Sequence, residues 1–267
     1  MIPKIINYCW FGGNTFGEKE KKCIDSWKKF LPGWKLILWN EENFDVHINS
    51  YAEEAYQAKK WAFVSDVARL AILNRVGGIY LDTDVEIVAS INDILQKGAF
   101  MGIESYKNGK VFVNPGLIIA SEPNNKVIND ILGTYNNDHF VKGNTNTSKY
   151  TIVERTTKIL KEKYKLQDVN QLQNLDGISI YPKEYFCPIE YETGKLNRTD
   201  QTRSIHWFTS SWLTDEQRIR QEICRKINNT LPAVIAKPSE FIYLKAGAAK
   251  DILKNKGIMG IIKRLKA

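Results

Sequence analysis

The sequence predicts one α/β domain, a central β-sheet flanked by helices, with a short helical appendage at its C-terminal end. Short runs of β-branched and aromatic residues alternate with longer segments whose apolar residues recur every three or four positions. The chain has 267 residues, enough to bury the core of one large α/β domain. Hydrophobic residues make up 43% and charged residues 25%, which is ordinary for a soluble globular protein.

The first part of the chain predicts two strands and two helices. The apolar run 2–10 indicates the first strand, and the Gly-rich segment 11–14 closes it with a turn. Segment 18–30 has one apolar face, which predicts a helix that ends before Pro32-Gly33. A second strand is expected at 34–39 and a second helix at 50–60. Trp10, at the carboxyl end of the first strand, is either a core residue or lies where a nucleotide could bind.

The central stretch from Trp61 to Glu86 organises the rest of the chain. Helical periodicity predicts a helix from Phe63 to Asn74. Gly77 and Gly78 then end it. An apolar run, 79–81, follows as a buried strand, and Asp82 and Asp84 stand at its end.

Asp82 and Asp84 are candidate metal ligands. If this segment stays extended, both carboxylates leave the same face of the strand. Two acids at one place repel each other unless a cation lies between them, and Mg²⁺ or Mn²⁺ prefers oxygen ligands. The alternative is a solvated turn. Asp66 and Arg69 share one flank of the preceding helix, where they form either a surface ion pair or part of the same cleft.

The remaining chain predicts further alternating elements. In order, these are a strand at 86–89, a helical turn at 91–95, strands at 99–104 and 112–120, helices at 124–134 and 150–164, a strand at 178–182 and a helix at 214–228. The polar segment 136–150 is expected to be a mobile loop that could bind an acceptor or form a lid. Asn114 starts an apolar run, where its amide either caps a turn or binds a hydroxyl.

At this point the residues resemble a known family. The pattern Ser65-Asp66-x-x-Arg69 followed by Gly77-Gly78-Ile79-Tyr80-Leu81-Asp82-x-Asp84 is similar to the DXD-motif sugar-nucleotide glycosyltransferases of family 32. That family includes the yeast initiating α-1,6-mannosyltransferase and capsular polysaccharide enzymes of bacteria. The large clostridial glucosylating toxins are more distant relatives. The resemblance implies a GT-A fold with a Rossmann-like mixed sheet, a Mn²⁺ or Mg²⁺ cofactor, a nucleotide-sugar donor and retention of anomeric configuration.

The resemblance also assigns roles to individual residues. The toxins have an aromatic-x-Trp-x-Gly-Gly segment whose Trp stacks on uracil, which implies base stacking by Trp10 and backbone contacts by Tyr8 and Cys9. Asn114 and Asp66 would contact hydroxyls of the donor sugar, and Arg69 would meet the charge of the diphosphate.

A second segment, 204–212, matches a Ser-Ile-His…Ser-Trp pattern of bacterial family members. A lone histidine is usually structural, but imidazole can complete the coordination of a metal. The resemblance therefore implies that His206 is the third metal ligand after Asp82 and Asp84. Ser211 and Trp212 would contact the diphosphate or close over it.

These assignments predict a metal-dependent retaining hexosyltransferase that uses a nucleotide sugar, with a UDP-sugar favoured, and a saccharide acceptor, either free or lipid-linked. Synthesis of a bacterial surface or capsular polysaccharide would suit such an enzyme. One alternative is a haloacid-dehalogenase-like phosphatase, whose motif requires Thr or Val where this chain has Glu86. The other is a non-enzymatic carbohydrate-binding or membrane-associated scaffold, which leaves the paired acids unexplained.

Charge is concentrated near the C-terminus. The chain carries a net charge of +8, and residues 237–267 hold eight basic and two acidic residues, a local charge of +6. We therefore divide the chain into a glycosyltransferase domain, 1–236, and a basic amphipathic tail, 237–267. The tail either contacts an anionic membrane surface or packs on the core. No nucleic acid is expected as a partner.

The sequence also gives expectations about location. It has no apolar run long enough for a transmembrane helix and does not start like a signal peptide. We therefore expect a cytoplasmic protein, either free or peripheral on the inner face of the cell membrane. The four scattered cysteines form no C-x-x-C pair, so we expect all four to be reduced.

Overall fold

The computed structural model describes residues 1–140, 151–209 and 215–231, together with the single positions 235, 239 and 243. The chain divides into two compact units, the first made of 1–189 and 197–212 and the second of 190–196 and 213–267. Each unit is described by itself. The boundary predicted at residue 236 rests on charge composition and stays a prediction.

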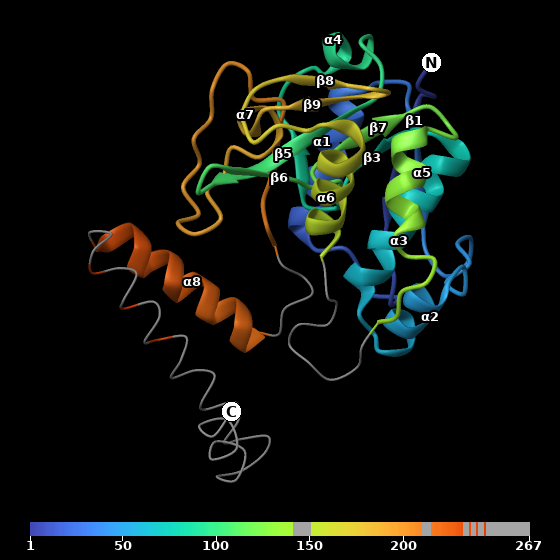
Figure 1. Ribbon diagram of the computed structural model, residues 1–267. Coiled ribbons are helices and arrows are strands. Elements are labelled where there is room, and N and C mark those ends of the chain that lie inside the picture. Colours follow the sequence, from blue (N-terminus) through green and yellow to red (C-terminus); the bar gives the residue numbers. More distant parts are fainter. Residues whose placement is uncertain (141–150, 210–214, 232–234, 236–238, 240–242, 244–267) are drawn as a thin grey trace. The chain divides into compact units, whose positions relative to one another are not determined.

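The N-terminal elements of the first unit follow the order that the sequence predicts (Figure 1). They are β1 (Ile5–Cys9), α1 (Glu18–Phe30), β2 (Lys35–Trp39), α2 (Ser50–Gln57), α3 (Trp61–Val76) and β3 (Gly78–Tyr80). Helix α1 has acidic residues in its first turn and basic residues in its last, which complements the helix dipole. Asn49 caps α2 by accepting a hydrogen bond from the backbone N–H of Ala52.

The later elements depart more from the prediction. They are β4 (Val85–Ile87), α4 (Asn92–Leu95), β5 (Phe100–Lys107), β6 (Lys110–Val113), β7 (Ile119–Ser121), α5 (Lys126–Gly133), α6 (Ile152–Tyr164), β8 (Gln173–Leu175), β9 (Ile178–Tyr181), α7 (Lys183–Phe186) and β10 (Ser204–His206). The single strand predicted at 112–120 is wrong. It is two strands, β6 and β7, because a turn at Asn114–Leu117 separates them. The sequence did not predict β8 or α7.

Within the described residues the central sheet has eight strands and is mixed. Its order is β2-β1-β3-β7-β5-β9-β8, and β6 pairs with β5. Strand β1 is parallel to β2 and β3, whereas β7 is antiparallel to β3 and β5. The predicted α/β architecture, a single mixed central sheet flanked by helices, is confirmed.

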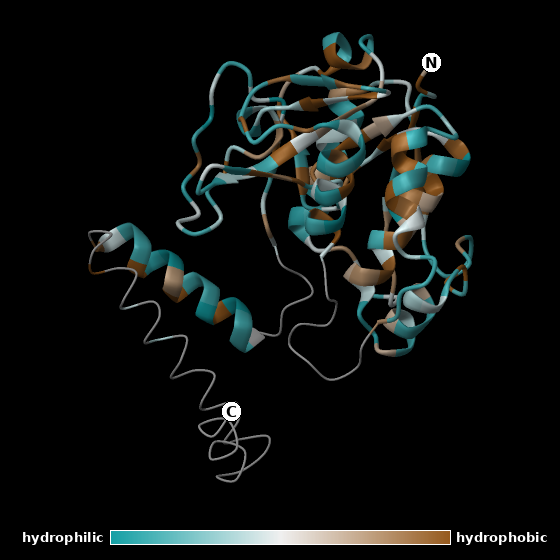
Figure 2. Cartoon of the chain, in the orientation of Figure 1, coloured by the Kyte–Doolittle hydropathy of each residue, from teal (hydrophilic) through white to brown (hydrophobic). Residues whose placement is uncertain are grey.

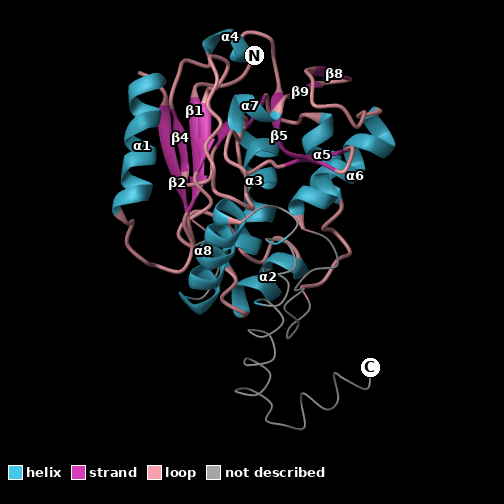
Figure 3. Cartoon of the chain, turned by 90° about the vertical axis from the view of Figure 1, so that its left-hand side faces the viewer, coloured by secondary structure: helices cyan, strands magenta, loops and turns pink. Residues whose placement is uncertain are grey.

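Alternate residues of the central strand β3 pack in two separate hydrophobic cores. In β3, Ile79 packs in the core with α1, α4 and α7, and Tyr80 packs in the core with α2, α3, α5 and α6. Strand side chains point to opposite faces in turn, so the sheet is covered on both sides. Figure 3 shows α1 on one side of the strands and α3, α5 and α6 on the other.

Two glycines form the junction between α3 and β3. Gly77 and Gly78 have φ angles of 65° and 98°, values that L-residues with a side chain rarely adopt. A Cβ on Gly78 would lie 2.5 Å from the carbonyl oxygen of Ile5 on β1. The predicted helix stop is therefore confirmed. It turns the chain directly from α3 into the sheet.

The second unit contains helix α8 (Asp215–Thr230), close to the predicted helix at 214–228. Arg225 and Asn229 donate side-chain hydrogen bonds to the carbonyls of Tyr191 and Thr193 at 3.2 and 2.6 Å. The helix is mostly hydrophilic (Figure 2). The predicted basic amphipathic tail, 237–267, lies outside the described residues except for positions 239 and 243. None of the helices described has both the length and the apolar character needed to cross a bilayer.

Candidate active site

Asp82 and Asp84 lie in a turn between β3 and β4. The backbone N–H of Val85 donates to the carbonyl of Asp82 at 3.0 Å, which is the hydrogen bond of a β-turn. The extended conformation considered for this segment is therefore wrong. The two carboxylates approach each other because the chain folds back on itself, and the approach does not depend on strand alternation.

Strand β10 brings His206 to the same turn. It pairs antiparallel with β4, so that His206 stands opposite Val85. The N–H of Trp207 also donates to the backbone carbonyl of Asp84 at 3.0 Å. One ligand atom each from Asp82, Asp84 and His206 lie within 4.8 Å of one another. The structure thus brings together the three residues predicted to be metal ligands.

Asp84 and His206 form a buried pair. His206 Nε2 lies 3.0 Å from Asp84 Oδ1, and the two residues are 8% and 9% exposed, respectively. Burial raises the pKa of Asp84, but the charge of His206 and hydrogen bonds from His206 and Thr209 outweigh it and lower the pKa to about 2. Burial lowers the pKa of His206, but the charge of Asp84 raises it to about 9. Both groups are therefore charged at neutral pH.

The cluster fits a divalent cation chemically. Two carboxylates and one imidazole suit Mn²⁺, and the carboxylates also suit Mg²⁺. The Nδ1 atom of His206 is buried and has no hydrogen-bond partner among the described residues. Burial raises the pKa of Asp82, and Asp84 contributes to the rise. A bound cation would relieve this repulsion and would displace the proton of His206, since only a neutral imidazole binds a metal.

Arg69 joins α3 to the turn. Its Nη2 atom lies 3.0 Å from Asp66 Oδ1 and 3.1 Å from Asp82 Oδ1. Its guanidinium also lies over the ring of Tyr80, 5.0 Å from the centroid. Arg69 is 4% exposed, so the surface ion pair considered for Asp66 and Arg69 is wrong. Burial raises the pKa of Asp66 to about 6, although Arg69 opposes the rise.

Asn114 caps a turn beside this cluster. Its Oδ1 accepts a hydrogen bond from the N–H of Gly116 at 2.7 Å, and its Nδ2 donates to Glu104 at 2.8 Å. A Cβ on Gly116 would collide with Asp82 and would lie 2.7 Å from Arg69 Nη1. Of the two roles weighed for Asn114, the structure contains the turn cap. The contact with a donor sugar stays a prediction.

Trp10 directly follows β1, at the sheet edge where Asp82 follows the parallel strand β3. Its indole N–H donates to the carbonyl of Asn14 at 2.5 Å, and its ring lies 4.7 Å from that of Phe16. The ring of Tyr8 packs on Trp27. Burial raises the pKa of the Cys9 thiol to about 12. The nucleotide contacts predicted for Tyr8, Cys9 and Trp10 stay predictions, and Ser211 and Trp212 lie outside the described residues.

Three residues of the site were missed by sequence reasoning. Thr209 donates two hydrogen bonds to Asp84, Tyr80 donates one to Asp82 at 3.0 Å, and Glu104 holds Asn114. Tyr80 lies inside the quoted pattern, two residues before Asp82, so its reach to that carboxylate could have been considered. Nothing in the sequence signals the roles of Thr209 and Glu104, because both depend on folding.

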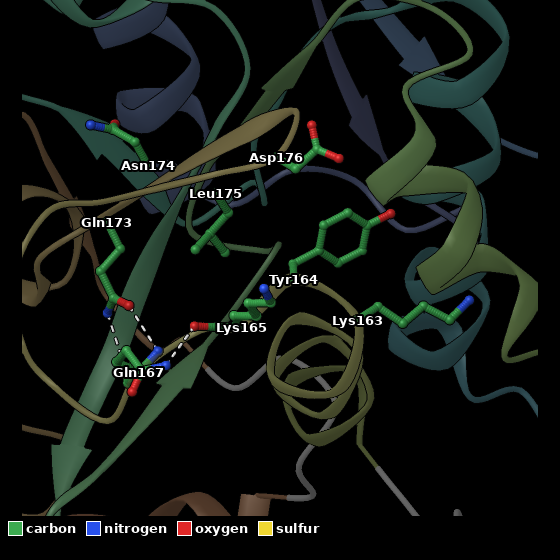
Figure 4. A pocket seen from close by; sticks show the side chains of 8 residues that line it. All are labelled: Lys163, Tyr164, Lys165, Gln167, Gln173, Asn174, Leu175 and Asp176. Carbon is green, nitrogen blue, oxygen red and sulfur yellow. Dashed lines mark hydrogen bonds between the residues drawn. The ribbon is translucent and has the colours of Figure 1, made fainter.

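An open groove of about 580 Å³ lies elsewhere in the first unit (Figure 4). Its lining comes from the end of α6, from β8 and from the segments beside them, and includes none of the candidate site residues. Gln167 and Gln173 bond to each other there, with Gln173 Oε1 accepting from the N–H of Gln167 at 2.8 Å. These amides are therefore already occupied locally. We place the chemistry at the Asp82–Asp84–His206 cluster.

Comparison with known proteins gives the class of this site. Residues 17–101 match the family model described as a glycosyltransferase sugar-binding region containing a DXD motif. The chain carries a glycosyltransferase region. The matched residues include Asp66, Arg69, Asp82 and Asp84, whereas Asn114 and His206 lie beyond them. The region belongs to a transferase, so the expected enzyme class is confirmed.

Two relatives carry glycosyltransferase names. An uncharacterized glycosyltransferase of Acanthamoeba polyphaga mimivirus is 28% identical over 201 residues, which are 70% of this chain and 78% of the viral protein. Inositol phosphoceramide mannosyltransferase 1 of Schizosaccharomyces pombe is 30% identical over 111 residues, which are 38% of this chain and 33% of the yeast protein. The solved structure of the PaToxG glycosyltransferase is 23% identical, with a TM-score of 0.46. The matched part covers 61% of this chain and 70% of the PaToxG chain.

Proposed function

We propose that the protein is a metal-dependent retaining glycosyltransferase of GT-A type that moves a sugar from a nucleotide-sugar donor to a hydroxyl of a saccharide acceptor. The observation that carries this proposal is the convergence of Asp82, Asp84 and His206 on one point beside Arg69. Three of these four residues lie in the matched DXD region, and the fourth arrives through a separate strand, β10.

The chain's own residues suggest how the leaving group is held. A divalent cation bound by Asp82, Asp84 and His206 would act as a Lewis acid toward the diphosphate. Burial lowers the pKa of the Arg69 guanidinium, but Asp82, Tyr80 and Asp66 raise it by more. Arg69 therefore remains cationic. It adds positive charge at the place where negative charge grows as the glycosidic bond breaks.

Retention of configuration is proposed through front-face attack. We assign no protein nucleophile. The bond between the anomeric carbon and the diphosphate oxygen breaks, and a bond from the acceptor oxygen to the same carbon forms on the same face. The acceptor proton passes to a phosphate oxygen of the departing diphosphate. In this scheme Asp66 and Asn114 fix hydroxyls of the donor sugar, so their loss would act mainly on donor orientation.

A uridine diphosphate sugar is the donor we favour, with Trp10 stacking on the base. Support comes from the place of Trp10 at the carboxyl edge of β1, beside β3, where ligands of α/β sheets commonly bind. The yeast relative is named a mannosyltransferase, so GDP-mannose also belongs in any donor screen. We further propose surface or capsular polysaccharide as the acceptor, on the inner face of the membrane, by analogy with the family that the sequence resembles.

Thermal unfolding with candidate ligands tests the donor. Binding to the folded state raises the melting temperature, so the chain is titrated with Mn²⁺ and a panel of UDP-, GDP- and CMP-sugars. We expect a rise that requires both Mn²⁺ and one nucleotide class, and a smaller rise for Trp10→Leu. The absence of any rise with every donor would contradict nucleotide-sugar binding.

Removal of the metal tests the mechanism. EDTA and Asp84→Ala should each abolish release of nucleotide diphosphate, whereas the matched change Asp25→Ala, at an exposed acid of α1 paired with Lys28, should leave it unchanged. Full activity in both EDTA and Asp84→Ala would refute the metal role.

The two alternative functions are not favoured. Glu86, which stands where a haloacid-dehalogenase-like phosphatase needs Thr or Val, accepts a hydrogen bond from Trp207 Nε1 at 2.9 Å and pairs with Lys22. A non-enzymatic scaffold gives no reason for a buried cluster of two acids and a histidine. Turnover of p-nitrophenyl phosphate would support the phosphatase and argue against our proposal.

A further inference from the structure

The segment from His206 to Thr209 holds every oxygen of Asp84. The Trp207 N–H donates to its backbone carbonyl at 3.0 Å, and His206 Nε2 lies 3.0 Å from its Oδ1. Thr209 donates twice to Oδ2, through its backbone N–H at 2.9 Å and its hydroxyl at 3.0 Å. Within one short segment, His206 therefore contacts one carboxylate oxygen of Asp84 and Thr209 contacts the other.

An unusual backbone conformation makes this arrangement possible. Phe208 has a φ of 51°, in the left-handed region that residues with a side chain seldom occupy. Its ring lies against that of His206, with the centroids 4.2 Å apart. The reversal at Phe208 lets the side chains of His206 and Thr209 reach the same carboxylate. A conformation of this kind persists only where its surroundings stabilise it.

We propose that Thr209 positions Asp84 as a one-oxygen metal ligand and thereby favours a small divalent cation over Ca²⁺. The inference rests on the proposed metal-dependent function. A carboxylate oxygen has about two lone-pair directions, and the two hydrogen bonds from Thr209 occupy both on Oδ2. On Oδ1, His206 Nε2 takes one direction at 3.0 Å, so the other direction on Oδ1 remains available for a metal.

The chemistry of the ions gives this arrangement a consequence. Mg²⁺ is small and is usually bound through few carboxylates, whereas Ca²⁺ takes six to eight oxygens and often both oxygens of one carboxylate. Blocking Oδ2 removes an oxygen that Ca²⁺ would use and leaves the one that Mn²⁺ or Mg²⁺ needs. Residues that orient a ligand by hydrogen bonding typically contribute 10-fold to 100-fold to metal affinity. Thr209 would act on both the strength and the selectivity of the site.

The test compares two changes at Thr209 in the full chain. Thr209→Val removes the hydroxyl and keeps the shape, whereas Thr209→Ser keeps a hydroxyl. The dissociation constant of Mn²⁺ is measured from the signal of free Mn²⁺ in electron paramagnetic resonance, and that of Ca²⁺ by competition. We expect Thr209→Val to weaken Mn²⁺ about 10-fold and Ca²⁺ much less, so that the selectivity ratio falls. Thr209→Ser should stay within about 2-fold of the unmodified chain.

A matched control separates this role from a general loss of structure. Thr134, at the end of α5, donates its hydroxyl to the carbonyl of Ile131 at 2.7 Å and has no part in the site. Thr134→Val should leave both dissociation constants unchanged. If Thr209→Val is unfolded in EDTA, Thr209→Ala removes the same hydroxyl without the added methyl group.

Three results would overturn the inference or the proposed metal-dependent function on which it rests. Unchanged Mn²⁺ binding in Thr209→Val, or equal weakening of both ions, would show that Thr209 does not select the ion. If the unmodified chain itself binds no Mn²⁺, the proposed metal-dependent function fails, and the inference fails with it. If that chain binds Mn²⁺ and only the Thr209 variants disagree, the proposed function stands and only the inference is lost.

Discussion

Arg69 and Asp82 form a buried ion pair, 3.1 Å apart, that ties the central helix α3 to the turn carrying the DXD acids. The same guanidinium holds Asp66, one turn earlier on α3, at 3.0 Å. Two carboxylates therefore share one cation. A third carboxylate, that of Asp84, lies two residues after Asp82 in the chain. This charge balance governs how the site responds to mutation.

Replacing Arg69 should harm both stability and catalysis. Arg69→Met leaves Asp66 and Asp82 without their cation, and breaking a buried pair in this way costs about 3–5 kcal/mol. Arg69→Lys keeps the charge but loses the planar fork that spans two carboxylates, so we expect a smaller loss of stability with a large loss of turnover. Urea unfolding and donor hydrolysis measure the two effects.

Arg75, later on α3, provides the control for this pair of changes. Its guanidinium lies over the ring of Trp39, 5.0 Å from the centroid, and the residue is exposed. Arg75→Met should cost about 1 kcal/mol or less and leave turnover intact. Equal effects at Arg69 and Arg75 would contradict a special role for the shared cation.

Gly116→Ala should distort the site directly. The added Cβ would collide with the carboxylate of Asp82 and press on Arg69 and Asn114. Overpacking of this kind costs about 1–3 kcal/mol, and the displacement of Asp82 should weaken Mn²⁺ binding. At Gly133 in α5 a Cβ meets nothing within 4 Å, so Gly133→Ala should stabilise the helix by up to about 1 kcal/mol. Normal Mn²⁺ affinity in Gly116→Ala would show that the turn can move aside.

The hydrogen bond between Asn114 and Glu104 can be tested by exchanging the roles of the two side chains. Asn114→Asp sets two carboxylates where the amide now donates at 2.8 Å, which should destabilise the protein by about 1–3 kcal/mol. Adding Glu104→Gln supplies a donor on the other side and should restore more than half of that loss. Chemical unfolding of the two single variants and the double variant forms a thermodynamic cycle. Strictly additive effects would mean that the pair contributes no coupling.

The metal-free protein should show a defined pH dependence that comes from Asp84 and His206. The pKa of His206 is raised from 6.5 to about 9, so its contribution to stability is complete below pH 6.5 and is lost as the pH rises through 9. The pKa of Asp84 is lowered from 3.8 to about 2. Its contribution is complete above pH 3.8 and is lost as the pH falls through 2.

Melting curves in EDTA can reveal this dependence. The difference in melting temperature between the unmodified chain and His206→Gln should be largest from about pH 4 to pH 6.5 and should shrink toward pH 9. A difference that is constant from pH 5 to pH 10 would contradict the raised pKa of His206. The comparison needs no donor and no activity, so it is independent of the proposed reaction.

The sequence by itself determined the local elements and the identity of the central acids. The periodicity of α3, the stop at Gly77 and Gly78 and the apolar run before Asp82 are all short-range properties, and they were predicted within a few residues. The resemblance to a DXD family selected His206 as the third ligand, and the fold brings it to the two acids.

Only the tertiary structure decided how these residues meet. Asp82 and Asp84 converge through a turn, Asn114 caps another turn, and Thr209 donates hydrogen bonds to Asp84, a contact that no sequence pattern indicates. The contact of Thr209 with Asp84 depends on pairing between distant segments, namely the antiparallel pairing of β10 with β4. Local periodicity carries no information about such pairing, because it reports which face of an element is buried and not which element covers it.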